Sequence, residues 1–357
     1  ENVRSFLNIP FGGTKIIFVT YESAHIVGKA MSNSEVFDFG IFDEAHKTAG
    51  REGRNYSFAL DDKNIPILKR LFVTATPRKY NPHKRKKLGE DTTVFSMDNP
   101  EIYGPHIYKL GFAEAAKRGI ICNYKIIITV ITSQTVTSEL IRRGETKVNG
   151  SSVKSRQVAN QIALCQAINK YGVKKIFTFH KSVKSAASFV SSGSEGIGSY
   201  LDDFRTLHVN GAIPTAQREQ LLNEFKSCNS GVISNARCLT EGVDVPAVDM
   251  VAFLSPRRSR VDIVQAAGRA MRKSPGKKLG YILVPLYVDL KQGETVDEAV
   301  ERSDFGELWD VLQSLQEQEI PTQTEGEHAE TSSKENDSDD DVPELVEDFE
   351  EASEKAN

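Results

Sequence analysis

The stretch Val36–Gly50 reads VFDFGIFDEAHKTAG, a short apolar run that ends abruptly in two carboxylates and a histidine. Apolar side chains on both faces of such a run predict a central strand of a parallel sheet, which helices cover on each side. In open parallel sheets, ligands bind beyond the carboxyl ends of the strands. The sequence therefore predicts chemistry at the acids that follow the run, Asp43 and Glu44.

These two adjacent acids leave the strand in different directions and can have separate tasks. A nucleoside triphosphatase holds Mg²⁺ at such an edge, because the hard cation takes oxygen ligands and bridges the β- and γ-phosphates. Asp43 is placed for this contact, and Glu44 can orient the attacking water. An acid pair by itself also fits an ordinary solvated strand end, so the interpretation depends on the rest of the chain.

Three further stretches follow in a fixed order, namely LFVTATP at 71–77, LTEGVDVP at 239–246 and QAAGRAMR at 265–272. With DEAH at 43–46, they resemble motifs II, III, V and VI of the superfamily 2 helicases and translocases, the DEAD/DEAH-box group. The residues of these motifs are most similar to those of the DEAH motors of restriction-type and predicted helicases. The resemblance implies two RecA-like α/β domains with parallel sheets, which use ATP and Mg²⁺ to move along nucleic acid.

The resemblance implies a role for each matching residue. The catalytic set consists of Asp43, Glu44, His46, Gln265, Arg269 and Arg272, with Mg²⁺ at Asp43 and Glu44. The nucleotide-binding set consists of Gly242 and Asp244. The set that binds nucleic acid or couples the domains consists of Thr20, Tyr21, Thr74, Thr76, His180 and Thr240. Read without the resemblance, Thr20 also fits a satisfied strand-end hydroxyl, and residues 242–246 fit an ordinary turn.

Motif VI is expected on a helix over residues 261–273. Gln265, Arg269 and Arg272 are four and three residues apart, so a helix places them on one face. A planar, permanently charged guanidinium suits a transferring phosphoryl group, and such arginine fingers contribute about 10³ to 10⁵ in rate. Ala266 stands where many relatives have arginine, which puts one auxiliary contact in doubt.

The start of this chain does not match the phosphate-binding loop that is expected in such a motor. Gly12-Gly13-Thr14-Lys15 leads into a predicted strand over Lys15–Tyr21, whereas a phosphate loop leads out of a strand. We interpret it as a turn. The chain is therefore expected to be an N-terminally truncated fragment that hydrolyses ATP poorly unless the Walker A segment is restored.

The alternation of strand and helix patterns predicts the domain plan. Strands are expected at 67–74, 124–132, 175–180, 207–211, 231–235 and 279–288, and helices at 111–119, 154–171 and 215–225. Ser182 is a plausible cap for a helix after the strand that resembles motif IV. The predicted parts are a partial RecA-like domain 1 at 1–118, RecA-like domain 2 at 119–290, a helical extension at 291–320 and a disordered acidic tail at 321–357.

Charge and composition narrow the partners. Residues 321–357 carry a net charge of −12 and the rest of the chain +8, which suggests a polyanion partner, and a tail that only adds solubility fits equally well. The resemblance implies that the polyanion is nucleic acid, DNA rather than RNA. A basic run made of Arg78, Lys79 and residues 84–87 fits phosphate contacts or a solvated loop. Four scattered cysteines predict a reduced, intracellular protein, and no run is long enough to cross a membrane.

Three functions remain open on the sequence. The first is a helicase or translocase core that couples ATP hydrolysis to movement along nucleic acid. The second is a restriction-type translocase that moves along double-stranded DNA without unwinding it. The third is a non-catalytic remnant that only binds nucleic acid. The apolar face of the C-terminal helix is predicted to pack on domain 2. A protein partner for that helix or for the acidic tail is the alternative.

Overall fold

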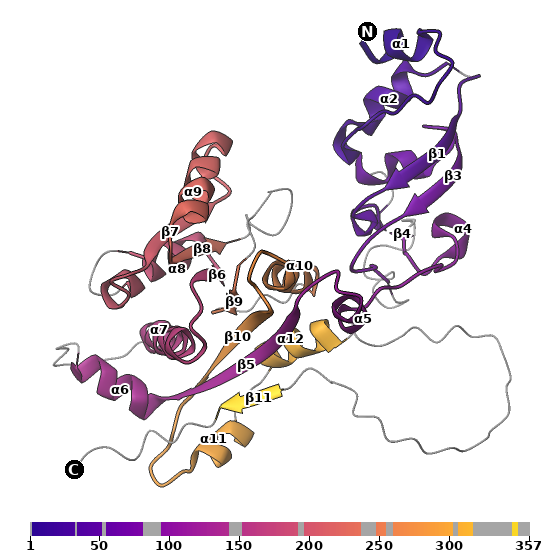
Figure 1. The fold of residues 1–357 in the computed structure, drawn as a ribbon. Helices are drawn as coiled ribbons and strands as arrows, with labels where there is room; N and C mark the ends of the chain where they lie inside the picture. The colour runs from indigo at the N-terminus through magenta and orange to yellow at the C-terminus, as the bar shows by residue number, and fades with distance from the viewer. Residues whose placement is uncertain are drawn as a thin grey trace, which may run out of the picture. The chain divides into compact units, whose positions relative to one another are not determined.

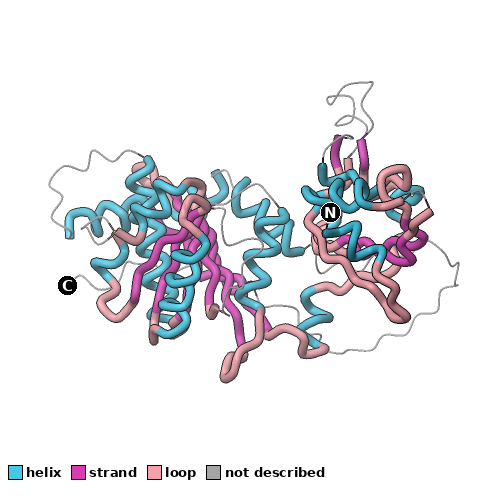
Figure 2. The backbone as a smooth tube through the Cα atoms, turned by 90° about the horizontal axis from the view of Figure 1, so that it is seen from above, coloured by secondary structure: helices cyan, strands magenta, loops and turns pink. Residues whose placement is uncertain are grey.

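The computed structural model divides the chain into two units, Glu1–Tyr108 and Lys109–Asn357 (Figures 1 and 2). The boundary lies ten residues before the expected one, and the helix at the predicted seam belongs to unit 2. The structure describes residues 2–32, 34–51, 55–80, 94–142, 152–191, 196–236, 248–254, 260–302, 306–316 and 345–348.

Unit 1 is built on two parallel strands, β1 (Phe37–Phe42) and β3 (Ile67–Phe72), which pair from Phe37↔Ile67 to Phe42↔Phe72. Its apolar core gathers buried residues of these strands and of the neighbouring helix α2, among them Val27, Phe42 and Ile67. Its other elements are α1 (Asn2–Asn8), η1 (Tyr21–Ser23), α2 (Ala24–Ala30), η2 (Ala45–Lys47), β2 (Gly50–Arg51), η3 (Asn55–Leu60), β4 (Val94–Phe95) and α4 (Pro100–Tyr103).

The strand β1 is parallel as expected, but it is not covered on both faces. Phe39 and Ile41 are 52% and 65% exposed, and Leu68 on β3 is 70% exposed. Within the described residues, β1 pairs only with β3, and side chains alternate between the faces of a strand. The expectation of a strand buried on both sides is therefore wrong for one face.

The strand predicted over Lys15–Tyr21 is also wrong. Residues 15–20 have no regular structure, and Ile16 and Phe18 are 64% and 93% exposed. A strand depends on ladder hydrogen bonds to a neighbour and on a covered face, and the described part of unit 1 supplies this segment with neither. Tyr21 itself begins the short helix η1, where its ring contacts the core.

Unit 2 is a layered α/β domain with one parallel sheet. In its described part, seven strands lie in the order β11-β5-β10-β9-β6-β8-β7. The strands are β5 (Asn123–Thr132), β6 (Lys175–Phe179), β7 (Arg205–Asn210), β8 (Gly231–Ala236), β9 (Met250–Phe253), β10 (Leu279–Val288) and β11 (Leu345–Asp348). The helices are α5 (Phe112–Lys117), α6 (Ser133–Arg142), α7 (Ser152–Tyr171), α8 (Val183–Phe189), η4 (Ile197–Tyr200), α9 (Thr215–Ser227), α10 (Arg260–Met271), α11 (Val296–Arg302) and α12 (Gly306–Gln316).

Helices cover both faces of this sheet, as its apolar strands require. Successive residues of β9 alternate between two core clusters: Val251 joins the one with α9, α10 and α12, and Ala252 the one with α7 and α8. Figure 1 shows α10 and α7 against the sheet in this arrangement. The predicted strands and helices of domain 2 are confirmed within one to a few residues, and Ser182 caps α8 by accepting a hydrogen bond from the Ser185 amide.

The C-terminal segments give one confirmation and one correction. Helix α12 packs on α10, and its Val311 and Leu315 are buried in the core, so the predicted packing on domain 2 is confirmed. Within the tail expected to be disordered, Leu345–Asp348 instead form β11, parallel to β5 with Leu345 opposite Ile126. Adjacent apolar residues, one of them β-branched, favour a strand there. No described helix is long and apolar enough to span a membrane.

Candidate functional site

The acids of the DEAH stretch lie on a sharp turn directly after β1. Glu44 has φ 48° and ψ 44°, and it is the one residue other than glycine with a positive φ in the described part of the chain. This left-handed conformation costs about 1–2 kcal/mol for an L residue. Two backbone bonds fix the turn: Val73 donates to the Phe42 carbonyl and Ala45 donates to the Val73 carbonyl, each at 2.9 Å. The strained turn is thus anchored to the end of β3.

Asp43 is exposed, and two contacts define its position. One carboxylate oxygen accepts the Glu44 amide at 2.9 Å, and its main-chain carbonyl accepts the Tyr21 hydroxyl at 2.6 Å. The Tyr21 ring also stacks near Phe42, with centroids 6.4 Å apart. Burial raises the pKa of Tyr21, and the charges of Asp43 and Glu44 raise it further. The hydroxyl therefore stays a donor, which gives the coupling role predicted for Tyr21 a contact to act through.

His46 joins the acidic turn to the stretch that resembles motif III. Its side chain is 2% exposed, and Nδ1 lies 3.0 Å from Thr74 Oγ1 and 3.3 Å from Glu44 Oε2. Thr74 Oγ1 also accepts the Thr76 amide at 3.1 Å. The structure thus brings together four of the predicted residues, and a change at the Glu44 carboxylate has a direct path to both threonines.

Two supporting residues were missed by the sequence analysis. Thr48 is 2% exposed, donates to the Ala45 carbonyl at 2.8 Å and lies 3.0 Å from the Tyr103 hydroxyl. The position of Thr48 just after the acidic motif was a signal in the sequence. Its partner Tyr103 is 55 residues away, and nothing in the sequence connected the two.

Thr20 is exposed, and its hydroxyl contacts the Ser23 hydroxyl at 3.1 Å. Both interpretations of Thr20 therefore stay open.

Helix α10 carries the motif VI residues, but they do not share one environment. The helix ends at Met271, because Pro275 lies close behind it and the turn at 274–277 reverses the chain. Arg269 is buried at 6% exposure, Gln265 is partly exposed, and Arg272 lies beyond the last helical residue and is exposed. The helix expected over 261–273 therefore ends two residues early, and Arg272 differs from Arg269 in exposure.

His180, at the carboxyl end of β6, is enclosed rather than exposed. The ring is 3% exposed, with Nε2 2.9 Å from Thr178 Oγ1 and its centroid 4.9 Å from that of Phe189. Burial, together with the nearby His208, lowers the pKa of His180 to about 3. A neutral, buried imidazole cannot contact a phosphate. Of the two roles predicted for His180, nucleic-acid binding and coupling, only coupling therefore has a geometric basis.

The neighbouring strand ends continue this buried polar network, which the sequence analysis missed. His208 Nδ1 lies 3.1 Å from Ser234 Oγ, and the Asn235 side-chain amide donates to the Thr178 carbonyl at 3.1 Å. The network therefore crosses three adjacent strands just before residues 237–247. Those residues include Thr240, Gly242 and Asp244, which lie outside the described residues, as do residues 84–87 of the basic run.

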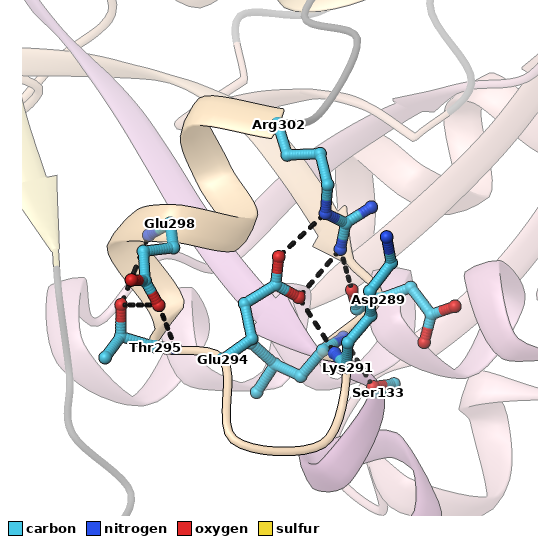
Figure 3. Close-up of polar contacts among 8 residues, drawn as sticks. Ser133, Asp289, Lys291, Glu294, Thr295, Glu298 and Arg302 are labelled. Atoms are coloured by element: carbon cyan, nitrogen blue, oxygen red, sulfur yellow. Dashed lines mark hydrogen bonds and ion pairs between the residues drawn. The ribbon is translucent and has the colours of Figure 1, made fainter.

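A second polar cluster closes the loop between β10 and α11 (Figure 3). Arg302 donates to both carboxylate oxygens of Glu294, at 2.7 and 2.8 Å, and to the Asp289 carbonyl at 2.7 Å. The Leu290 amide donates to Ser133 Oγ at 3.0 Å, which ties the loop to the start of α6. The bonds to Arg302 lower the pKa of Glu294 to about 2. This cluster fixes helix α11 to the loop that follows β10.

The acidic turn offers few oxygen donors to a divalent cation. In the described residues, no group of three or more His, Cys, Asp or Glu side chains could hold a metal by itself. An exposed carboxylate with a free oxygen, as at Asp43, instead fits an ion that takes its other ligands from phosphate and water. The residues present therefore fit a nucleotide-bound Mg²⁺ rather than a resident metal.

A protein-family comparison matches residues 159–274 to the helicase conserved C-terminal domain. Over these residues, unit 2 is similar to a helicase C-terminal domain. The match includes His180 and the whole of α10, but it does not reach the acidic turn of unit 1. The family model therefore supports the interpretation of motif VI and leaves the roles of Asp43 and Glu44 to other evidence.

Relatives extend the similarity over most of the chain. The probable helicase A859L of African swine fever virus (isolate Pig/Kenya/KEN-50/1950) is 27% identical over 278 residues, which are 77% of this chain and 28% of that protein. The same viral protein from isolate Tick/Malawi/Lil 20-1/1983 is 26% identical over 278 residues, with the same two coverages. The chain thus spans about a quarter of the length of the curated relatives it matches.

Two solved structures match the fold. The ATP-dependent Type ISP restriction-modification enzyme LlaBIII bound to DNA is 27% identical with a TM-score of 0.63, over 83% of this chain and 21% of that one. A nuclease-deletion mutant of the Type ISP enzyme LlaGI, in complex with a DNA substrate mimic, is 26% identical with a TM-score of 0.54, over 88% and 20%. The chain is therefore helicase-like, RecA-like in fold and related to restriction-enzyme and viral motors.

Proposed function

We propose that this chain is the greater part of an ATP-dependent motor that moves along DNA. The observation that carries the proposal is the acidic turn of unit 1. There His46 contacts Glu44 on one side and Thr74 on the other, so the residues that resemble motifs II and III meet at the carboxyl ends of two parallel strands. Ligands of parallel α/β sheets bind at this edge.

The charges of the turn suit a triphosphate. In the proposal, Asp43 holds Mg²⁺, which when bound neutralises negative charge on the phosphates. Glu44 orients the attacking water and accepts its proton, and its strained backbone presents the carboxylate beside His46. Thr74 and Thr76 then sense the state of Glu44 through His46. The structure supports these assignments by proximity.

Unit 2 contributes the positive charge in this proposal. Arg272, exposed beyond the end of α10, contacts the phosphates, and Arg269 reinforces it from a buried position. Nucleotide contacts at Gly242 and Asp244 and a nucleic-acid contact at Thr240 remain proposals from the motif. An arginine at a phosphoryl group supplies a charge that no change of pH removes.

A second candidate, translocation on double-stranded DNA without strand separation, is favoured by the two restriction enzymes that match most of the chain. The two candidates differ in what happens to the strands. A strand-displacement assay reports unwinding, and a triplex-displacement assay reports translocation on intact duplex. Activity in the second assay alone would select the restriction-type motor.

The test of the proposed chemistry is Glu44→Gln in the longest natural polypeptide that contains this chain. DNA-stimulated ATP hydrolysis is expected to fall at least about 100-fold, because removal of a general base typically costs 10²–10⁴ in rate. Nucleotide binding, measured by calorimetry with Mg·ATP, is expected to persist.

The matched control is Glu22→Gln, which removes a carboxylate from an exposed position of unit 1. The control is expected to keep full turnover. Turnover of Glu44→Gln equal to that of the control would eliminate Glu44 as the catalytic acid. A wild-type protein that binds DNA but neither binds nor hydrolyses ATP would instead select a non-catalytic binding module.

A further inference from the structure

The end of helix α10 is held by one partly buried ammonium group. The last carbonyls of a helix have no partners within it. Here Lys277 Nζ donates to the carbonyls of Ala270, of Arg272 at 3.1 Å and of Val248 at 2.5 Å. Lys277 thus joins the final turn of α10 to the residue that precedes β9 by two positions.

The local sequence explains how Lys277 reaches this place. Pro275 and Gly276 form a turn in which the Lys277 amide donates to the Ser274 carbonyl at 3.1 Å, and Gly276 has φ +79°. The turn folds the lysine back over the helix end. An ammonium offers three donors from a single point, whereas a guanidinium spreads its donors over a rigid plane. Three convergent carbonyls therefore select lysine.

Two further contacts close the same helix end. The Cys122 amide donates to the Met271 carbonyl at 2.9 Å, and the buried Cys122 thiol lies 3.6 Å from the Ala270 carbonyl. At Gly280, an added Cβ would lie 2.1 Å from the Ala270 carbonyl oxygen, so β10 approaches the helix as closely as a backbone can. The final turn of α10 has little room to shift while these contacts hold.

We propose that Lys277 is a positioning residue, which locks the end of α10 to the start of β9 and thereby sets the direction in which Arg272 leaves the helix. The lock also bridges two stretches that resemble nucleotide-facing motifs, because Val248 follows residues 239–246 and Arg272 ends residues 265–272. Its catalytic consequence rests on the proposed function, whereas the lock itself does not.

The lock is tested on this chain through the thiol of Cys122. Lys277→Met keeps the length of the side chain and removes the charge, and Lys278→Met removes a charge from the exposed neighbouring position. Alkylation of each cysteine is followed by peptide mass spectrometry. Lys277→Met is expected to raise the rate at Cys122 by on the order of 10-fold or more, and Lys277→Arg by less.

Cys165, which packs against the opposite face of the sheet, reports global unfolding in the same experiment. A rise at Cys122 with no rise at Cys165 supports a local lock. Equal rates at Cys122 in Lys277→Met and Lys278→Met, or a parallel rise at both cysteines, would overturn the lock.

The catalytic consequence is tested by ATP hydrolysis in the longest natural polypeptide that contains the chain. Lys277→Met is expected to lower kcat about 10-fold or more with KM little changed, while Lys278→Met matches the wild type. An unchanged kcat in Lys277→Met, beside a raised alkylation rate, would overturn the positioning role. A wild-type protein without ATPase activity would refute the proposed function alone, because the alkylation result decides the lock independently.

Discussion

Acidification below pH 6.5 is expected to destabilise unit 2 through His180. The unfolded histidine binds its proton with a pKa of about 6.5, whereas burial and the nearby His208 lower the pKa in the folded state to about 3. Between these values the unfolded chain binds one more proton than the folded chain. The free energy of unfolding therefore falls as the pH falls, by up to about 1.4 kcal/mol per pH unit. Above pH 6.5 the penalty is absent.

The magnitude at pH 5 follows from this slope. Over the 1.5 units below the unfolded pKa, the loss is about 2 kcal/mol, a large part of the 5–15 kcal/mol that stabilises a typical domain. The ring is 3% exposed, so solvent screening does not reduce this figure much. Burial also lowers the pKa of His208, which adds a penalty of the same sign. Most carboxylates titrate below pH 5, which separates their effect from that of the histidines.

The assay is urea unfolding at pH 7.5 and pH 5.0, followed by fluorescence. The sequence has a single tryptophan, Trp309, which belongs to unit 2, and far-UV circular dichroism follows the same transition. His180→Gln removes the titrating group and is expected to lower the stability at pH 7.5 but to reduce its further loss at pH 5.0. His106→Gln, at an exposed position of unit 1, is the control and should behave as wild type. Equal losses between the two pH values in the wild type and in His180→Gln would refute the reasoning.

Two other predictions concern the polar contacts that support the site and the C-terminal helices. Arg302→Gln is expected to lower the urea midpoint of unit 2, because it removes the bidentate pair with Glu294, and 1 M NaCl should shrink the difference from wild type. Lys291→Gln is its control, and equal midpoints for the two variants would contradict a stabilising pair. Thr48→Val should destabilise the acidic turn by about 1–3 kcal/mol, because it leaves the Ala45 carbonyl and the Tyr103 hydroxyl without this partner. Faster hydrogen exchange in residues 43–48 than in an exposed Thr14→Val control would confirm this, and equal exchange would count against it.

The fold of unit 2 could be predicted because its strands carry their own signal. Runs such as Tyr124–Thr132 and Leu279–Val288 are apolar on both faces, and helices of clear periodicity separate the strands, so a covered parallel sheet is the natural solution. The run Lys15–Tyr21 looks similar by itself. Its neighbours decide the outcome, and the described part of unit 1 pairs no strand with it, so a local pattern was not sufficient.

The neighbours of the acidic turn were predicted, but its construction was not. The sequence analysis placed Thr74 and Thr76 beside the acidic motif, and His46 does contact Thr74. The sequence did not indicate the left-handed backbone at Glu44, because such a conformation is usually predicted from a glycine and this position is a glutamate. The contact of Thr48 with Tyr103 joins residues 55 positions apart, and no periodicity connects them. Long-range side-chain contacts of this kind depend on the finished fold.

Two of the supporting contacts share a physical cause. In unit 1 the Tyr21 hydroxyl donates to the Asp43 carbonyl, and in unit 2 the Lys277 ammonium donates to the carbonyls at the end of α10. Charged residues at the ends of strands and helices stand where backbone groups lose their regular partners. A side chain from elsewhere must then satisfy the backbone, and any well-placed donor can do so. The residues that would act on a ligand can therefore be predicted from sequence motifs, whereas the residues that position them depend on the tertiary structure.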